Sequence, residues 1–566
     1  RITANDALFA RIDALHRQRQ TLGLAAEQLR LLERKHLDFV RDGAALPAPQ
    51  KKRYGEIMER LSVLGTSFRQ NLLADEAAYA LVLDGEADLA GLPEFLRAAM
   101  QSLATERGHD GKHVVTLNRS IIEPFLTFSS RRDLREQAFN AWVKRGANGG
   151  DTDNRAIITE MLRLRLERAN LLGYATYADY VLDDTMAKSA DTVARFLRDV
   201  WRPAVRRLAG ERQKLQAAAT AKGHNEPVRP WDWRYYAEQV RKAEYDLDEA
   251  ELKPYFSLER IIEAAFYTAE RLFGLSFLPR PDVPTYHPEV RAFEVRDGAG
   301  NHLGLFLADY FARASKRSGA WMSGFRAQHN LPPGGGQRPI VVNVLNFAKG
   351  AAGTPSLLSI DDALTLFHEF GHALHGLMSD VTYPTLSGTN VARDFVELPS
   401  QLYEHWLETP EILSRFARHA TTGEPMPAAM IDKIRASRTF NQGCQTIEYL
   451  SSAMVDIAFH RLTDFEGVEP LAFEQATLAA IGMPGDMVMR HATPHFQHIF
   501  AEDAYSAGYY SYLWSEVLDA DAFEAFRERG DVFDRQLGDK LARNIYAAGA
   551  TRAPEAAYIG FRGRLP

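Results

Sequence analysis

The sequence predicts a mainly α-helical protein with a small β-sheet, and three observations indicate this fold class. Apolar residues recur at helical spacing through most of the 566 residues. Strand patterns are few and are confined to residues 292–347. The chain is longer than one ordinary hydrophobic core requires, so two lobes or more are expected.

Amphipathic helices are predicted through the first half of the chain. Gly43 and Gly173 end two of them, and Asn154 is expected to cap one at its start. The expected helices cover residues 25–41, 51–73, 154–173, 191–222, 231–248 and 258–273.

Strands are predicted only in the middle of the chain. Residues 292–296 and 302–307 are separated by the turn residues 297–301 and predict a hairpin. Residues 340–347 predict a third strand, directly before the next helix.

That next helix begins after Ser359, an expected N-cap. Asp361 and Asp362 follow in the first turn, where carboxylates complement the helix dipole. Apolar residues then continue at helical spacing, at Leu364, Phe367, Phe370, Leu374 and Leu377.

This helix carries a predicted metal site. His368 and His372 are one turn apart on one face, so both imidazoles can bind a single ion. Glu369 lies about 100° round the helix and can contact a water bound to that ion. The alternative is a core helix with two incidental histidines. We interpret the pattern as a zinc helix.

A catalytic zinc usually has three protein ligands. Position 378 is Met378, which excludes a third histidine at metzincin spacing. His375 lies two turns beyond His368 and is expected to be a packed residue. A carboxylate from a second helix remains. Spacing slightly favours Glu397 and leaves the choice open among Asp394, Glu397, Glu404 and Glu408.

The run of residues 357–406, which contains HEFGH and DFVELPSQ, resembles the zinc-metallopeptidase family of thimet oligopeptidase, neurolysin and bacterial peptidyl-dipeptidases. Three further blocks resemble it, and those at 123–142 and 309–322 are most similar to the bacterial peptidyl-dipeptidase branch. The third block covers residues 504–523. The resemblance therefore extends over most of the chain.

The resemblance implies roles for particular residues. Glu397 corresponds to the third zinc ligand, and His498 resembles a substrate-binding histidine. Tyr505, Tyr509 and Tyr512 recur at i, i+4 and i+7, which predicts one helical face and would otherwise indicate an aromatic core stripe. In the family, the positions of Tyr505 and Tyr512 hold transition-state tyrosines, and Tyr505 and Tyr509 are expected to contact substrate.

The expected mechanism follows from these groups. Zinc held by the two histidines and the glutamate acidifies its bound water toward a pKa of about 7. Glu369 accepts the proton and delivers it to the leaving amine. Tyr512, with Tyr505, stabilises the oxyanion. Asp394 and Glu404 are candidates to orient the zinc histidines.

The resemblance also implies the architecture: two helical lobes flanking a deep substrate channel, with the small sheet beside the zinc helix. Residues 340–347 are then expected to be an edge strand that pairs with an extended peptide. We expect an N-terminal helical region, residues 1–142, truncated at its start. Residues 143–566 are expected to form the catalytic region.

One segment departs from the family pattern. Relatives usually have glycines before the first tyrosine, whereas this chain has Glu502, Asp503 and Ala504. Fewer glycines predict a stiffer loop, and Glu502 is expected to disfavour acidic peptides if it faces the channel.

Composition limits the classes of function and partner that remain possible. A net charge of −7 does not provide the excess of basic residues expected of a protein that binds nucleic acid or an anionic membrane. Cys444 is the single cysteine, so an intramolecular disulfide is excluded. The expected partners are short unstructured peptides, and the protein is expected to be a cytoplasmic monomer, with the periplasm as the alternative location.

The expected activity is that of a zinc peptidyl-dipeptidase, which removes dipeptides from free C termini. An endo-acting oligopeptidase of the same family is the first alternative. A catalytically silent peptide-binding protein is the second.

Overall fold

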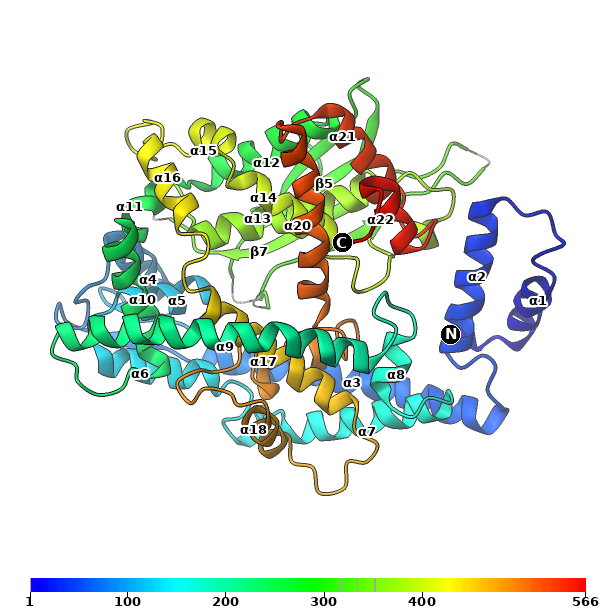
Figure 1. Ribbon diagram of the computed structural model, residues 1–566, viewed down its shortest axis with the longest axis horizontal. Helices are drawn as coiled ribbons and strands as arrows, with labels where there is room; N and C mark the ends of the chain where they lie inside the picture. The colour runs from blue at the N-terminus through cyan, green and yellow to red at the C-terminus, as the bar shows by residue number, and fades with distance from the viewer. Residues whose placement is uncertain (1, 314, 318, 333, 351–352) are drawn as a thin grey trace.

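The computed structural model describes residues 2–566 except 314, 318, 333 and 351–352, so two positions of the 309–322 motif lie outside the described residues. The described chain is mainly helical, as predicted (Figure 1). Its α-helices are α1 Asp6–Arg17, α2 Ala26–Arg41, α3 Ala48–Ala78, α4 Glu94–Glu106, α5 Arg119–Phe128, α6 Arg132–Val143, α7 Arg155–Leu171, α8 Tyr177–Leu182, α9 Ala190–Ala221, α10 Pro230–Tyr245, α11 Glu249–Leu252, α12 Leu258–Phe273, α13 Ile360–Leu377, α14 Leu398–Leu407, α15 Pro410–Phe416, α16 Ala428–Ala436, α17 Gln442–His460, α18 Pro470–Ala480, α19 Gln497–Phe500, α20 Ser511–Arg529, α21 Arg535–Leu541 and α22 Pro554–Arg562. The strands are β1 Leu81–Leu83, β2 His113–Val115, β3 Ser276–Pro279, β4 Arg291–Arg296, β5 His302–Phe311, β6 Trp321–Arg326 and β7 Ile340–Phe347.

Each predicted helix of the first half is present, and the expected N-cap Asn154 precedes α7. Its side chain does not cap the helix, however. The amide nitrogen Nδ2 of Asn154 instead donates to the carbonyl oxygens of Pro494, at 3.1 Å, and Phe68, at 3.4 Å. The residue is fully buried, so its amide joins segments far apart in sequence rather than ending one helix.

The main sheet has the strand order β3-β4-β5-β7-β6. The predicted hairpin is β4 and β5, and β7 covers the predicted third strand. β7 runs parallel to β5 and antiparallel to β6. Our expectation that residues 340–347 form an edge strand is wrong, because β6 pairs with β7 from Trp321 opposite Val344 to Arg326 opposite Ile340. The edge strand on this side of the sheet is β6, whose last four residues are all exposed and therefore lack the alternation that predicts a strand.

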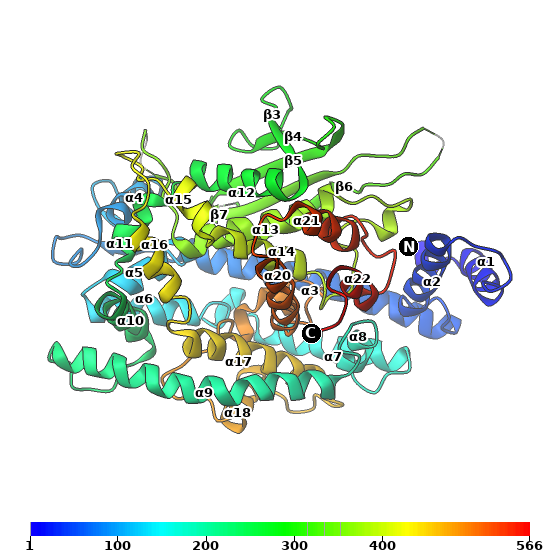
Figure 2. The ribbon, with the colours of Figure 1, turned by 45° about the horizontal axis from the view of Figure 1, so that its top comes forward.

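Two large cores divide the molecule. The sheet half contains the five-stranded sheet, α12 to α16, most of α20, and α21 and α22 around one core. The helical half contains α3, α7 to α10 and α17 to α19 around another. Figures 1 and 2 show the two halves as separate layers, with α20 running from one toward the other. Trp514 of α20 packs against both cores.

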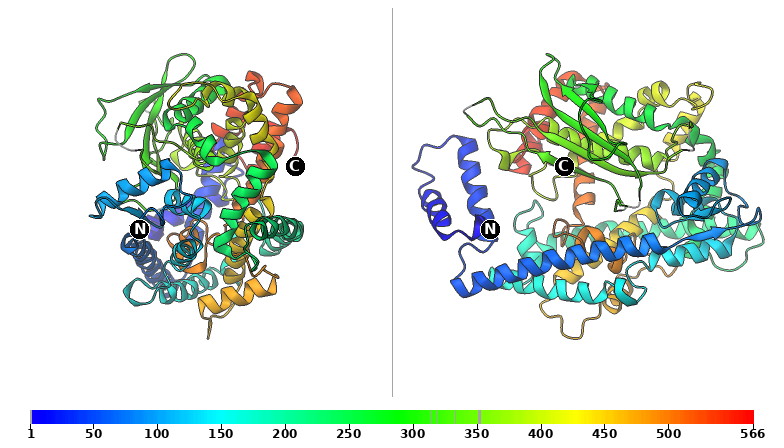
Figure 3. Two further views of the ribbon diagram at one scale, coloured as in Figure 1. Left: turned by 90° about the vertical axis from the view of Figure 1, so that its left-hand side faces the viewer. Right: turned by 180° about the vertical axis from the view of Figure 1, so that it is seen from behind.

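A third cluster unites β1, β2 and α4 to α6, and the helical pair α1 and α2 lies at the opposite end of the molecule (Figure 3). α2 contacts both halves. The carboxylate of Glu27 accepts hydrogen bonds from Thr382 in the sheet half, and Arg34 pairs with Asp184 of the helical half at 2.6 Å. The proposed boundary at residues 142 and 143 stays a prediction. Among the described helices, none combines the length and apolar character needed to cross a bilayer.

Candidate metal centre and active site

The metal site begins with the start of α13. The Ser359 hydroxyl oxygen accepts from the Asp362 amide at 3.0 Å, and the Asp362 carboxylate accepts from the Ser359 amide at 3.1 Å. This reciprocal capping box sets where the helix begins and hence which face each later side chain occupies.

A glycine lets the second element of the site approach. A Cβ on Gly371 would lie 2.7 Å from the Cα of Ser400 and 2.8 Å from the carbonyl oxygen of Pro399. Both neighbours belong to the first turn of α14. The two helices can therefore pack closely only because position 371 has no side chain, and this contact places Glu397, directly before α14, beside the histidines.

His368, His372 and Glu397 converge. Their ligand atoms all lie within 4.8 Å of one another. The Glu397 Oε2 atom is 3.2 Å from the Nε2 atom of His368 and 3.0 Å from that of His372. Ligands bonded at 2.0–2.1 Å in a tetrahedron lie about 3.4 Å apart, so this donor set fits a zinc ion.

Electrostatics agree with a metal-binding role. Glu397 is buried, which alone would raise its pKa, but His372 and His368 outweigh burial and hold the pKa of this carboxyl well below its usual range. The two imidazole side chains retain 17% and 12% exposure, so neither ring is sealed from solvent. The group is thus a charged carboxylate and two imidazole nitrogens, which is a donor set that zinc prefers.

Glu404 orients one histidine. Its Oε1 atom lies 2.6 Å from the Nδ1 atom of His368, which leaves Nε2 facing Glu397. The other candidate, Asp394, does not contact a zinc histidine. It accepts hydrogen bonds from the backbone amides of Met186 and Ala187 and from the Tyr510 hydroxyl.

Glu369 is 5% exposed, and its Oε2 atom has no hydrogen-bond partner among the described residues. Burial raises the pKa of this carboxyl, against the attraction of His368 and His372. Glu369 is therefore an available proton acceptor next to the ligand set. His375 is fully buried on the same helix, and burial, with His372, lowers its pKa to about 3, consistent with the predicted packed role.

The predicted helical face of three tyrosines is wrong. α20 begins only at Ser511, so Tyr505 and Tyr509 lie in the turns that precede it. Ala507 takes a left-handed φ of 55° between them, which no helix would allow. Backbone conformation, rather than helical spacing, brings these rings together.

The three rings still gather at the metal site. Tyr505 and Tyr512 stack with centroids 5.3 Å apart, and Tyr509 lies 5.4 Å from Tyr512. The Tyr505 hydroxyl donates to Glu397. Burial raises the pKa of both Tyr505 and Tyr512, so each phenol keeps its proton at neutral pH and can donate it in a hydrogen bond.

Buried groups of α17 hold the tyrosine turn. The Asp456 carboxylate accepts from the amides of Ala507, at 2.8 Å, and Tyr509, at 3.0 Å. The Tyr449 hydroxyl donates to the Tyr509 carbonyl at 2.6 Å and accepts from the Leu513 amide at 3.2 Å. These hydrogen bonds offset the energetic cost of the left-handed backbone conformation at Ala507.

His498 of α19 faces the same rings. Its centroid is 5.2 Å from that of Tyr509 and 6.1 Å from that of Tyr512. Its Nδ1 atom is buried and has no partner within the described chain. Burial, with Arg490, lowers the pKa of His498 to about 4, so the ring is neutral at pH 7.

The segment that departs from the family pattern is tied down by ion pairs. Asp503 pairs with Arg165 at 2.8 Å and with Arg168 at 3.0 Å. Glu502 pairs with Arg317 at 3.0 Å and lies 3.6 Å from Arg69. Arg317 follows β5 in the sheet half, so Glu502 connects the two halves.

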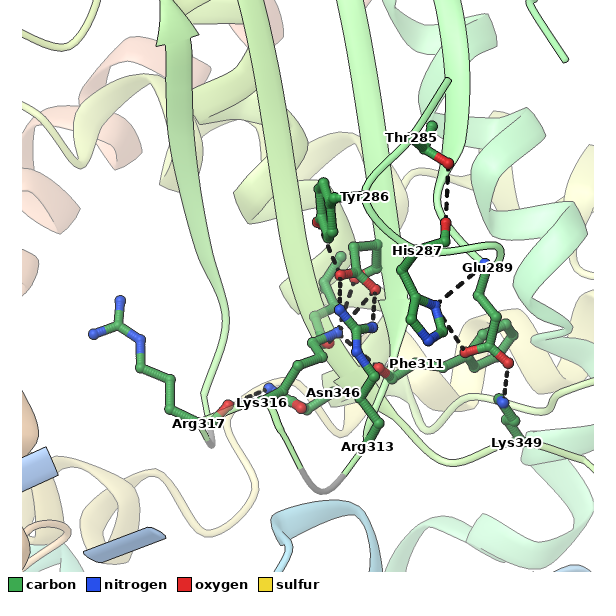
Figure 4. A network of polar contacts seen from close by, with 12 residues as sticks. Thr285, Tyr286, His287, Glu289, Phe311, Arg313, Lys316, Arg317, Asn346 and Lys349 are labelled. Carbon is green, nitrogen blue, oxygen red and sulfur yellow. Dashed lines mark hydrogen bonds and ion pairs between the residues drawn. The ribbon is translucent and has the colours of Figure 1, made fainter. Parts of the chain in front are cut away.

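The residues after β5 are themselves anchored. Asp309 is 1% exposed and accepts from the Tyr286 hydroxyl at 2.9 Å, from Arg313 at 2.8 Å and from Lys316 at 3.1 Å. Figure 4 shows these side chains converging, while Arg317 points away from them. Burial, opposed by Asp309, lowers the pKa of Lys316 to about 8.

Sequence reasoning missed several residues of this site. The guanidinium carbon of Arg393 lies 4.5 Å from the ring centroid of Tyr505, and Tyr449 and His491 pack against Tyr509. Arg393 directly precedes Asp394, the first of the four carboxylates considered as the third metal ligand, and this neighbourhood was the one signal that could have found it. Tyr449 and His491 lie on segments whose spacing gives no signal.

Comparisons with known proteins agree with the site. The chain matches Peptidase family M3 over residues 125–566. It is 40% identical to "Dipeptidyl carboxypeptidase" of Escherichia coli (strain K12), over 100% of this chain and 83% of that protein. It is 36% identical to "Oligopeptidase A" of the same organism, over 94% and 78% of the two chains.

A solved structure shows the same fold. "PZ peptidase A with inhibitor 2" superposes with a TM-score of 0.57 at 13% identity, over 99% of this chain and 81% of that one.

Proposed function

This chain belongs to peptidase family M3, and we propose that it is a zinc-dependent peptidyl-dipeptidase that releases dipeptides from the free C termini of short peptides. The observation that carries the proposal is the 40% identity to dipeptidyl carboxypeptidase along the whole chain. The converging His368, His372 and Glu397 support it, because a catalytic metal needs such a set.

His368, His372 and Glu397 would hold the zinc ion. When bound, zinc supplies Lewis-acid chemistry, which acidifies a water ligand and polarises a carbonyl group. Glu404 fixes the ring of His368 and leaves the nitrogen on the ligand side free.

Glu369 is the general base of the proposed mechanism. Its unpartnered oxygen accepts the proton of the attacking water and later passes it to the leaving amine. Burial keeps the pKa of this carboxyl above that of an exposed glutamate, which makes it a better proton acceptor once ionised.

Tyr512 and Tyr505 are the proposed oxyanion donors. Their phenols remain protonated because burial raises both pKa values. Tyr505 donates to Glu397, a metal ligand, whereas the Tyr512 hydroxyl is hydrogen-bonded, within the described chain, only to that of Tyr505, so Tyr512 is the phenol that can turn to a substrate oxygen. His498 and Tyr509 complete the wall that contacts the peptide.

An endo-acting oligopeptidase is the second candidate, and the 36% identity to oligopeptidase A favours it. The two activities use the same metal site and differ in whether a free C terminus is recognised. A monomeric state and a cytoplasmic location are also proposed.

Mass spectrometry of the products from one ten-residue peptide distinguishes the two activities. The peptide is supplied with a free or an amidated C terminus, with and without a chelator. We expect stepwise loss of dipeptides from the free form, abolished by the chelator.

Internal cleavage of both forms would instead identify an oligopeptidase. Absence of chelator-sensitive cleavage in either form would support a peptide-binding protein without activity.

A further inference from the structure

A cluster of charged side chains joins α5, α10 and α17, and Asp361 and Asp362 at the start of α13 also act on its Arg119. Arg119 pairs with Glu123 at 2.9 Å, and Arg234 lies 3.4 Å from Glu123 and 3.6 Å from Glu448. Glu123 and Glu448 thus each already have a cation. Arg490, the third arginine, is exposed, and its guanidinium has no hydrogen bond or ion pair to any described residue.

The backbone places Arg490 next to the tyrosines. Its amide donates to the carbonyl of Glu448 on α17 at 2.8 Å. The following residue, His491, packs with its ring 4.9 Å from that of His498 and 5.7 Å from that of Tyr509. The charge of Arg490 also lowers the pKa of His498 and of Tyr509, although burial dominates both values. Arg490 therefore lies at the border of the substrate-contacting wall.

We propose that Arg490 binds the C-terminal carboxylate of the peptide substrate. The inference rests on the proposed peptidyl-dipeptidase function and identifies the residue that sets its specificity. Two extended residues reach about 7 Å beyond the cleaved bond. Tyr509 lies 5.4 Å from Tyr512 and 5.7 Å from His491, the residue after Arg490, so one ring connects the proposed oxyanion donor to the segment that carries Arg490.

The other cations near the site are already engaged. Arg313 and Lys316 both bind the buried carboxylate of Asp309, and Arg317 pairs with Glu502. Arg393 is half-buried, packs on the ring of Tyr505 and lies within the field of the Glu397 carboxylate. Arg490 is an exposed cation near the tyrosine wall with neither a ring contact nor an ion pair to a described residue, and a substrate carboxylate would supply its missing negative charge.

Bidentate pairing of arginine with a carboxylate is strong and geometrically selective, whereas a C-terminal amide cannot form it. A free C terminus should therefore bind more tightly than its amide by the strength of a charged hydrogen-bonded pair. Losing this charge-assisted pair is expected to raise KM about 10–100-fold.

The test compares kcat and KM of the metal-loaded enzyme on one peptide with a free or amidated C terminus. In Arg490→Gln, we expect KM for the free peptide to rise about 10–100-fold, with kcat/KM for the amide within about two-fold of wild type. Arg490→Lys keeps the charge and should recover part of the loss. Arg202→Gln, an exposed arginine of the outer helix α9, is the matched control and should change neither substrate.

Unchanged discrimination between free and amidated peptide in Arg490→Gln would overturn the assignment, and so would loss of discrimination in Arg119→Gln alone. Wild-type enzyme that cleaves both peptides internally with equal efficiency would refute the proposed function itself, which is a different result. Zinc content and kcat on the free peptide in each variant report that the site has folded.

Discussion

At the scale of single residues, the site depends on which atoms hold protons. Glu369 has one oxygen without a partner, the phenols of Tyr505 and Tyr512 remain protonated, and Glu404 fixes the ring of His368. Each of these properties leads to a measurable effect of one substitution.

Glu369→Gln should keep the metal and lose turnover. The amide has nearly the same shape as the carboxylate but cannot accept the proton of water, so kcat should fall about 10²–10⁴-fold. Metal content measured by mass spectrometry is the control and should match wild type. A variant that retains both zinc and the wild-type rate would refute the general-base role.

Tyr512→Phe should reduce kcat about 10²–10³-fold, with KM nearly unchanged, because the hydroxyl acts on the transition state. Tyr505→Phe is the comparison. Its hydroxyl also donates to Glu397, so this variant should weaken metal binding as well. Equal metal affinity in the two variants would contradict that distinction.

Glu404→Gln should change how metal binding depends on pH. Burial opposes protonation of His368, but hydrogen bonds with Glu397 and Glu404 outweigh it and hold its pKa well above 6.5. A metal must displace that proton, so affinity falls as pH falls, and the fall begins above pH 6.5.

In the Glu404→Gln variant an uncharged amide oxygen replaces the carboxylate, so protonated His368 is less stabilised and loss of metal should begin at lower pH. At neutral pH its affinity should also be about 10–100-fold weaker, because a neutral acceptor holds the ring less firmly and makes it a weaker ligand. Titration against a competing chelator across pH measures both effects. An identical pH midpoint in the variant would contradict the role of Glu404.

At the scale of elements, the close packing of α13 and α14 determines whether the third ligand reaches the histidines. Gly371→Ala places a Cβ against the backbone at Pro399 and Ser400. We expect a destabilisation of about 1–3 kcal/mol, typical of overpacking, together with weaker metal binding. Thermal and chelator titrations measure these two quantities.

Gly210→Ala in the middle of α9 is the matched control. Nothing lies within 4 Å of the added Cβ there. Replacing a helix-interior glycine by alanine should stabilise by about 0.5–1 kcal/mol and leave metal affinity unchanged.

The sheet changes the way in which peptide binding can be tested. β7 pairs on both sides, so Val344→Pro would break contacts with β5 and β6 and destabilise the sheet whether or not a peptide binds. β6 has an unpaired side, and its exposed residues are the place to look for pairing with an extended substrate.

At the scale of the whole molecule, the metal ligands belong to the sheet half and the tyrosines to the helical half, so the active site requires both cores to be held together. Asp394 makes one connection. Its buried carboxylate accepts from Met186, Ala187 and Tyr510, all of which lie outside its own segment.

Asp394→Ala should lower the free energy of unfolding by about 1–3 kcal/mol for each buried donor left without a partner. Turnover should fall as well, because the tyrosines lose their fixed position relative to zinc. Asp394→Asn keeps one acceptor oxygen and should lose less. Equal melting temperatures for wild type and Asp394→Ala would contradict this connection.

Local patterns in the sequence determined the helical fold class, the hairpin, the third strand, the N-cap at Ser359 and the pairing of His368 with His372. Periodicity and capping act between residues a few positions apart, so one sequence contains the full signal. The family resemblance added Glu397, which residue spacing alone left among four carboxylates.

Only the tertiary structure decided which distant residues meet. The order of β6 and β7, the turn at Ala507 that stacks Tyr505 on Tyr512, and the choice of Glu404 over Asp394 as the partner of His368 all depend on contacts between separate elements. The position of Arg490 near the tyrosines, without an ion pair to a described residue, was also decided by the tertiary structure. Such contacts are set by packing between two cores, and no local spacing encodes them.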